Sequence, residues 1–418
     1  MRRIYLTAML LFFISFLQAQ EYTISDLEAN FLANNYELIA QKFNIQRADA
    51  EMVQERVWPN PTFSISEVNI WKNNTAEVLP HLFGNYGKHQ QIAFELEQMI
   101  ETAGKRKKRV ALRKLEKESE ILDYEDLIRE LKKDLRQTFN TLGQQERESQ
   151  QLQGIYEGFQ RLYQQYSNQA TSNNVSKADV YRIQAELIAL QKEVIALDAE
   201  KRESLQKLIV LTQIPDLTIS KLVLPTVTVG LSLRVSTQTN LTDVGENTTL
   251  KKQSNELAKA NQEFAIEKSN RVPDLTFQMN YDRGGNIMQD FIGLGVSFDI
   301  PVFNRNKSKI KAVSYQIEHE TKKLQSIQFD VEQSALRLHQ QLIQYEEALA
   351  RWDEYKFEDY KTIVDSYRRN LQDGKVSLVT YVDFMRSFRE SQQVYLELVS
   401  DYMNSYEELQ YILGKDFQ

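Results

Sequence analysis

The sequence predicts a mainly helical protein that also carries four strands of membrane-spanning length, arranged as a twofold internal repeat. Three observations lead to this prediction: long stretches without proline, apolar residues at a spacing of seven, and segments in which apolar and polar residues alternate. The chain has 418 residues but only seven prolines and 14 glycines. A chain of this length usually forms two or three compact domains, but such long proline-free stretches instead indicate extended helical hairpins.

The longest proline-free stretches are the predicted hairpins. Between Pro80 and Pro215 there are 134 residues, and 117 residues follow Pro301. Within these stretches the apolar residues recur every seven positions, a period that specifies antiparallel or parallel coiled-coil packing. The clearest series are Ile310, Ile317, Leu324, Val331, Leu338, Tyr345 and Trp352, then Tyr381, Phe388, Tyr395, Tyr402 and Leu409, and in the first half Ile183, Leu190 and Leu197.

The two halves of the chain repeat one another. Residues 57–63 (VWPNPTF) match 271–277 (RVPDLTF) at an offset of 214, and the segments that start at Leu96 and Asn174 match segments 202 and 201 residues further on. Three matches in the same order indicate a repeat with an insertion at 71–88 in the first copy. We expect a signal peptide at 1–19, a first repeat at 20–213 with a strand pair at 61–98, a connecting equatorial segment at 214–246, and a second repeat at 247–418 with a strand pair at 274–300.

Each repeat is predicted to run as helix, strand, loop, strand, very long helix, short turn and long antiparallel return helix. A helix from 104 to 168 would be about 100 Å long at ~1.5 Å per residue, and the return helix at 176–212 covers a little over half of that length. The helix at 25–57 supplies the remainder, so we expect it to stack end to end with the return helix. The second repeat allows the same arrangement beside a long helix at 307–371.

The strand segments alternate apolar and polar residues. The pattern is clear over 92–97, 275–281 and 292–300, and about ten such residues form a tilted membrane strand. If these strands span a membrane, three carboxylates on the polar side should face a barrel lumen: Glu95, Glu97 and Asp299. A small soluble sheet with one wet face explains the alternation equally well.

Composition and motifs narrow the class of protein. Arg2 and Arg3 followed by an apolar run from Ile4 to Leu17 and then Ala19 predict a secretory signal peptide. Its removal takes away two arginines and leaves 49 basic against 58 acidic residues, a net charge of −9, which disfavours nucleic-acid binding. The chain has no cysteine. It carries no recognisable catalytic, phosphate-binding or metal-ligand motif, so we expect no enzyme activity, no cofactor and no metal site.

Four strands cannot close a membrane barrel, so closure requires an oligomer. A dimer would provide eight strands, whose interior is filled by side chains, and a trimer would provide twelve. Conduction of solutes therefore favours a trimeric twelve-stranded barrel, which the helical hairpins would continue as a tube.

The sequence resembles the TolC-type outer-membrane efflux proteins, the outer-membrane factors of tripartite pumps and type I secretion systems. The resemblance covers nearly all of the mature chain: the repeat, the strand pairs, the V-S-x-x-D turn at 175–179, the G-x-V-S turn at 374–377 and the Leu-Gly at 413–414. The phrase IETAGKR at 100–106 resembles the heavy-metal (Czc/Cus-like) branch that works with RND pumps. By this resemblance, 94–98 ends a membrane strand, 102–104 turns out of the bilayer and 105–109 begins the tunnel helix.

The resemblance also implies the location, the partners and the working parts. It implies a homotrimer in outer-membrane lipid with a helical tunnel in the periplasm, a periplasmic adaptor (membrane-fusion) protein, and an inner-membrane RND or ABC transporter that supplies the energy. Asp383, Thr380 and Asp179 occupy gate positions, whereas Leu371 and Val376 replace the tyrosine and arginine that lock the gate in some members. The periplasmic tips that would contact partners are Asn174, Val175, Ser176, Gly374, Lys375, Val376 and Ser377.

The function predicted is a passive duct for the export of small solutes, including heavy-metal cations, across the periplasm and the outer membrane. A duct for drug efflux or for type I protein secretion is an alternative within the same class. A soluble secreted coiled-coil interaction protein is the alternative from another class. Simpler structural roles compete at single residues, since Ser176 and Ser377 can each cap a returning helix.

Overall fold

The computed structural model of the chain describes residues 21–68, 81, 90–172, 175–224, 230–238, 240–283, 290–352 and 357–417, with side chains omitted at 357–361. The predicted signal peptide, and the predicted insertion at 71–88 except for residue 81, lie outside the described residues. The chain divides into two compact units, each with residues from both predicted repeats. We call them the helical unit (Met1–Ala40, Tyr124–Leu250 and Ile327–Gln418) and the sheet unit (Gln41–Asp123 and Lys251–Ser326).

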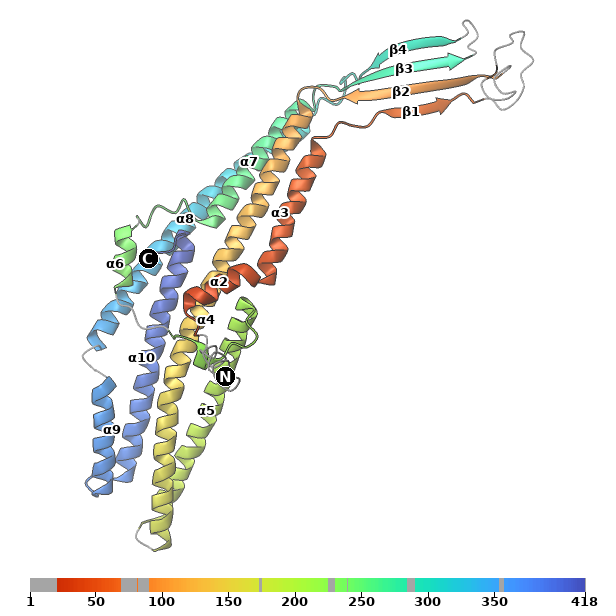
Figure 1. Cartoon of the computed structure of the whole chain (residues 1–418). Coiled ribbons are helices and arrows are strands. Elements are labelled where there is room, and N and C mark those ends of the chain that lie inside the picture. The colour runs from red at the N-terminus through yellow and green to blue at the C-terminus, as the bar shows by residue number, and fades with distance from the viewer. Residues whose placement is uncertain are drawn as a thin grey trace, which may run out of the picture. The chain divides into compact units, whose positions relative to one another are not determined.

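The element order confirms a mainly helical fold with one small sheet (Figure 1). Strand pairs precede long helices in both halves, as the repeat predicts. The helices are α2 (Ile24–Asn34), α3 (Tyr36–Glu55), α4 (Lys105–Thr171), α5 (Lys177–Thr212), η1 (Ile219–Lys221), α6 (Leu231–Gln238), α7 (Thr248–Ser269), α8 (Lys307–Trp352), α9 (Phe357–Gln372) and α10 (Leu378–Leu413), and the strands are β1 (Thr62–Ser66), β2 (Ile92–Ile100), β3 (Leu275–Arg283) and β4 (Phe291–Ser297).

The four strands form one antiparallel sheet in the order β1-β2-β3-β4 (Figure 1). The register places Phe94 opposite Ile65 and Tyr281, and it places Met279 opposite Leu96 and Leu294. Because side chains alternate between the faces of a sheet, this register puts the apolar residues of all four strands on one face.

The predicted end of the last strand is wrong. Alternation continues to Ile300, but β4 ends at Ser297. Ser297 lies opposite Thr276, so residues 299 and 300 would have to pair with residues 274 and 273, which precede the start of β3 at Leu275. One of those is Pro273, which has no N–H to donate. Asp299 therefore lies outside the strand, and its predicted position on the lumen side of a strand is not observed.

In the sheet unit, α3 packs along the start of α4 through a series of ion pairs. Arg47 pairs with Glu120 at 3.4 Å, and Lys117 pairs with Asp49 at 2.5 Å. Helix α7 approaches α4 through Asn255, whose side chain donates a 2.8 Å hydrogen bond to the carbonyl of Leu115. Half-exposed residues dominate this part of α4. A helix of this kind has only a narrow apolar face to bury, so polar contacts help to hold it against its neighbours.

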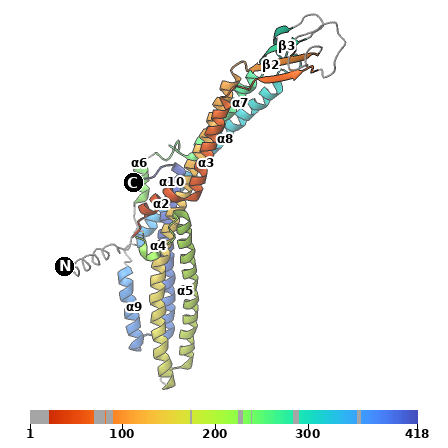
Figure 2. The ribbon, with the colours of Figure 1, turned by 45° about the vertical axis from the view of Figure 1, so that its right-hand side comes forward.

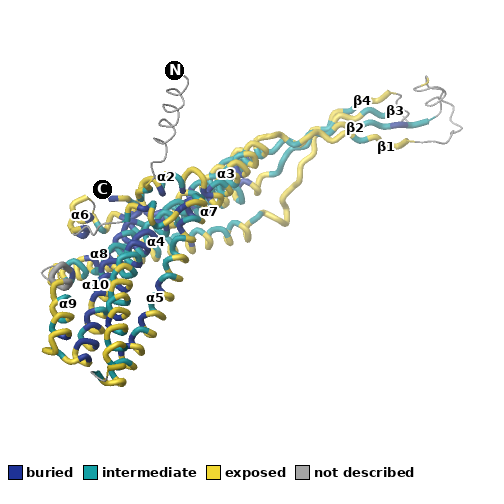
Figure 3. Tube along the Cα trace, turned by 60° about the horizontal axis from the view of Figure 1, so that its bottom comes forward, coloured by how far each residue is buried: buried dark blue, intermediate teal, exposed yellow. Residues whose placement is uncertain are grey.

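In the helical unit, α4, α5, α9 and α10 bury most of the predicted seven-residue series on α5 and α10, whereas Trp352, which ends the series on α8, is 51% exposed. Ile183, Leu190 and Leu197 of α5 join Tyr381 and Phe388 of α10 in one apolar cluster. Figure 2 shows α4 beside α5 in this unit, and Figure 3 shows buried positions running along the helices, with exposed positions on their outer sides. The coiled-coil periodicity is thus realised as buried helix seams.

The single helix predicted at 25–57 is wrong, because Asn35 separates α2 from α3. Its side-chain oxygen accepts hydrogen bonds from the backbone N–H groups of Glu37 and Leu38, at 3.0 and 3.2 Å, and so caps α3. Its amide donates a 3.0 Å bond to the carbonyl of Leu211 on α5. The helix predicted at 307–371 is described as α8 and α9, and residues 353–356 lie outside the description.

Candidate membrane surface and channel tip

The apolar face of the sheet is exposed in the single chain. Across β1, β2 and β3 it carries a row of stacked rings, with Phe63 and Phe94 6.0 Å apart and Phe94 and Tyr281 6.1 Å apart between centroids. A contiguous apolar surface of this kind marks a site of contact with lipid or protein. Its most exposed members are Leu294 at 84%, Ile292 at 63%, Phe63 at 61%, Ile65 at 55% and Val296 at 55%.

The opposite face of the sheet is polar and carries two of the predicted lumen carboxylates. The register places Glu95 opposite Asn280 and Glu97 opposite Gln278, and the Gln278 amide donates a 2.6 Å hydrogen bond to Glu97. Gly293 leaves room on this face for the Asn280 side chain, because an added Cβ would lie 2.2 Å from its side-chain oxygen. The sheet therefore has one face suited to lipid and one suited to water.

The turn that follows β2 is where the two repeats are joined in the sheet unit. Asp274, just before β3, accepts a 2.9 Å hydrogen bond from the backbone N–H of Thr102 and a 2.8 Å bond from the ammonium of Lys105. The Lys105 side chain is 9% exposed. Burial raises the pKa of Asp274, but the bonds from Lys105 and Thr102 outweigh it, so the pKa is lowered.

The basic block at 105–109 begins α4 as predicted, and most of it has partners within the chain. Arg106 lies over the ring of Trp58 at 3.6 Å, and Lys108 donates to the carbonyl of Ala103 at 3.0 Å. Arg109 pairs with Glu55 at 2.5 Å and with Glu101 at 2.7 Å. These contacts hold the turn between β2 and α4 together.

The helix tips are closed by the two predicted serine caps. Ser176 Oγ accepts from the N–H of Ala178 at 3.1 Å, and Ser377 Oγ accepts from the N–H of Thr380 at 3.2 Å. Gly374 has a φ of +69°, a left-handed conformation that favours glycine. Of the remaining predicted tip residues, Val175, Lys375 and Val376 lie in these turns, and Asn174 lies outside the described residues.

The three predicted gate residues lie near the tips, but among the described residues no hydrogen bond or ion pair joins one of them to another. The hydroxyl of Thr380 lies 2.9 Å from Ser377 Oγ, so it forms a hydrogen bond within its own turn. Asp179 lies in the first turn of α5. Burial raises the pKa of Tyr166 on α4, and the charge of Asp179 raises it further. Asp383 is exposed on α10.

A buried ion-pair cluster that the sequence did not reveal links α5 to α10 behind the tips. Glu186 is 6% exposed and accepts from Arg386 at 3.0 Å and from Arg389 at 3.5 Å. The hydrogen bond to Glu186 raises the pKa of Arg386, and the charge of Asp383 contributes to the same shift. Asp383 therefore has a guanidinium close by on its own helix, which partly compensates its charge.

None of the described helices combines the length and the apolar character that a membrane-crossing helix needs. Within the described ranges, no group of three or more His, Cys, Asp or Glu side chains could hold a metal ion.

The fold is that of solved outer-membrane channels. The chain aligns with the outer-membrane channel OprN at a TM-score of 0.74 and 13% identity, covering 94% of this chain and 90% of that one. It aligns with the CmeC outer membrane channel of Campylobacter jejuni at 0.72 and 15%, covering 94% and 86%. The open state of the MtrE outer membrane channel of Neisseria gonorrhoeae gives 0.70 and 13%, covering 94% and 89%.

A sheet with one apolar and one polar face, joined to long helical hairpins, thus defines the class as an outer-membrane channel fold. Residues 28–212 match the model of the outer membrane efflux protein family. No curated protein matches the sequence significantly. The predicted resemblance to TolC-type proteins is confirmed, and the matched family and channels are outer-membrane proteins, in agreement with the predicted location.

Proposed function

We propose that the protein is a passive export duct of a tripartite efflux system, and that it works as a homotrimer. The observation that carries the proposal is the four-stranded sheet with open edges at β1 and β4 and an exposed apolar face. Unpaired backbone groups are too costly in hydrocarbon for an open edge to persist there, so the edges must pair with other copies.

Three copies supply the number of strands that leaves a conducting interior. Eight strands enclose a space that side chains fill, whereas larger barrels enclose aqueous channels. The alternation of β2 and β3 supports a lumen lined by Glu95, Glu97, Gln278 and Asn280. The protein would need no catalytic centre, because an inner-membrane RND or ABC transporter would supply the energy.

The helix tips are the proposed contact with the periplasmic adaptor. Their turns are short and capped, and both belong to the helical unit. In the trimer, three copies of Asp383 around a narrow axis would attract cations. Asp179 and Thr380 would lie beside this ring, and Arg386 would moderate its charge.

The proposal that the exported solutes include heavy-metal cations comes from the motif at 100–106. Within IETAGKR, Thr102 and Lys105 bind Asp274, Arg106 covers Trp58 and Gly104 adopts a φ of +66°. Each of these contacts builds the turn between strand and helix, so a heavy-metal cargo rests on the resemblance of the motif alone. Sensitivity of a gene-disrupted strain to Cu, Zn, Co and Cd tests it, and unchanged resistance to all four metals contradicts it.

The duct itself is tested by single-channel conductance of the detergent-purified protein in planar bilayers. Discrete, cation-preferring steps are the expected result. Fractionation gives the control, because a duct is recovered with the outer membrane and requires detergent. Recovery in the soluble fraction would favour the secreted coiled-coil interaction protein instead.

A further inference from the structure

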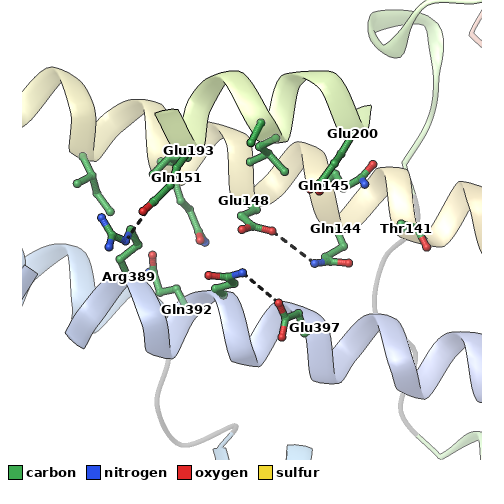
Figure 4. Close-up of a pocket in the computed structure, with 15 residues that line it drawn as sticks. Thr141, Gln144, Gln145, Glu148, Gln151, Glu193, Glu200, Arg389, Gln392 and Glu397 are labelled. Carbon is green, nitrogen blue, oxygen red and sulfur yellow. Dashed lines mark hydrogen bonds and ion pairs between the residues drawn. The ribbon is translucent and has the colours of Figure 1, made fainter. Parts of the chain in front are cut away.

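A polar cavity of about 430 Å³ lies between α4, α5 and α10, within the helical unit (Figure 4). Glutamate and glutamine side chains make up most of its lining, and Arg389 is its one arginine. The carboxylates come from all three helices: Glu148 from α4, Glu193 and Glu200 from α5, and Glu397 from α10. Glu148 is half-buried, whereas Glu200 and Glu397 are exposed, and like charges that share one cavity repel one another unless something offsets them.

The cavity has an excess of negative charge. Arg389 pairs with Glu193 at 3.4 Å and also with Glu186 at 3.5 Å, so its single charge is divided between two carboxylates. In the described part of the chain, no ion pair reaches Glu148 or Glu397, whose hydrogen bonds come from glutamines. The cavity can therefore accept a cation without displacing an existing salt bridge.

This arrangement disfavours the charged form of Glu148. Burial raises its pKa, and the charges of Glu397, Glu200 and Glu193 raise it further, while a 3.4 Å hydrogen bond from Gln144 opposes the shift. A carboxylate that the fold keeps beside three others, at a cost in stability, is a functional-site candidate. A bound cation would remove that cost.

Gln392 gives an independent indication of a ligand. The residue is only 9% exposed, its side chain lines the cavity (Figure 4), and no hydrogen bond joins that side chain to another described residue. Buried amides nearly always have a hydrogen-bond partner. The carbonyl oxygen of Gln392 is thus available to accept a bond from a donor inside the cavity.

The positions of the acceptor groups indicate which kind of cation the cavity can bind. A metal ion needs several ligands converging on one point, and no described group of His, Cys, Asp and Glu provides this. The acceptors are instead spread out, since Glu193 and Glu200 lie two helical turns apart, roughly 10 Å along the axis. We propose that the cavity binds a linear polyamine, whose separated ammonium groups pair with Glu148 and neighbouring carboxylates and donate to Gln392.

The proposal does not depend on transport, because the cavity is complete within one chain. Spermidine is the probe. Titration of spermidine into the detergent-purified full chain is followed by calorimetry and by thermal unfolding. We expect Glu148→Gln to weaken spermidine binding by at least roughly tenfold, the factor that corresponds to loss of one partly buried charge pair.

The matched control is Glu157→Gln, which removes an exposed carboxylate from the same helix outside the cavity lining. It should leave the affinity unchanged. Gln392→Met keeps a similar volume but removes the amide, and it should weaken binding several-fold while circular dichroism shows an unchanged helix content.

Two results would overturn the proposal. One is equal spermidine affinity in the wild type, Glu148→Gln and Gln392→Met, which includes the case of no binding to any of them. The other is equal stabilisation of the wild type by Mg²⁺ at matched ionic strength, which would show a general cation effect rather than a polyamine site.

Discussion

At the scale of single residues, Asp383 and Arg386 make opposite contributions to the charge near the tip. If three copies of Asp383 form a ring, Asp383→Ala removes three negative charges from the axis, and the preference for cations should fall several-fold. The measurement is the reversal potential in a KCl gradient across a planar bilayer. Asp401→Ala, an exposed carboxylate five turns further along α10, is the control. An unchanged reversal potential in Asp383→Ala would remove the ring hypothesis.

Glu186 is the residue that holds the tips of the two hairpins together within one chain. Glu186→Ala leaves Arg389, whose side chain is 18% exposed, without its buried partner, and loss of one member of a buried pair costs about 3 kcal/mol. We expect a clearly lower Tm and a larger open-channel current. Glu193→Ala removes a carboxylate that is 43% exposed and pairs with the same arginine. Its effect should be below about 1 kcal/mol, and equal losses in the two variants would contradict this role.

The sequence could predict the serine caps and the buried heptad residues, because both follow from local spacing. It could not predict the partners of Glu186, which lie 200 and 203 positions away. Ion pairs leave no periodic pattern, and a carboxylate on a helix is usually solvated. For the same reason, the sequence could not predict the contact between Lys105 and Asp274, which are 169 positions apart.

At the scale of elements, the turn between β2 and α4 depends on Asp274 more than on Lys105. Asp274→Ala leaves a buried ammonium unpaired, whereas Lys105→Met leaves a carboxylate that is 28% exposed and still bonded to Thr102. We expect Asp274→Ala to lower stability by about 2–3 kcal/mol and Lys105→Met by less. Thermal unfolding of both variants checks the order, and the reverse order would be inconsistent with this account.

The same turn gives a pH dependence. The pKa of Asp274 is lowered in the folded protein, so its contribution to stability is present at neutral pH and is lost as the pH falls through that lowered value. The difference in Tm between wild type and Asp274→Ala should therefore be largest near neutral pH and shrink in acid. A constant difference over this range would show that the carboxylate charge is not involved.

The two faces of the sheet can be tested separately. Leu294 is 84% exposed on the apolar face, while Asn280, one residue along from its partner Met279, lies on the polar face. Leu294→Lys should prevent insertion, since a lysine facing the bilayer midplane costs about 2–4 kcal/mol. Asn280→Lys should insert like the wild type. Flotation with liposomes measures both, and equal flotation would assign neither face to lipid.

Strand positions could be predicted from alternation, but strand ends could not. Alternation continues through Ile300, yet a strand extends only as far as its neighbour offers backbone partners, and β3 offers none before Leu275. Similarly, apolar spacing continued through Asn35, but its bond to the carbonyl of Leu211 divides the helix there. In both cases a contact from a distant segment overrides the local pattern.

At the scale of the whole molecule, the chain has two open sheet edges and no cysteine anywhere in its 418 residues. Disulfides between introduced cysteines can therefore show which strand edges meet, because no native cysteine competes with them. In a closed barrel the β4 edge of one copy lies beside the β1 edge of the next, in antiparallel orientation. Ser297 on β4 and Ser64 on β1 both lie on the polar face, so their side chains would approach each other across such a seam.

We expect Ser297→Cys, combined in turn with cysteine at Thr62, Ser64 or Ser66, to form disulfides between copies when the register brings the Cα atoms within roughly 7 Å. Oxidation of the protein in detergent should then give a ladder that ends at three linked chains. Each single-cysteine variant should remain unlinked across this seam. A ladder that ends at two chains would mean an eight-stranded assembly, whose interior is filled by side chains, and would contradict the proposed conducting trimer.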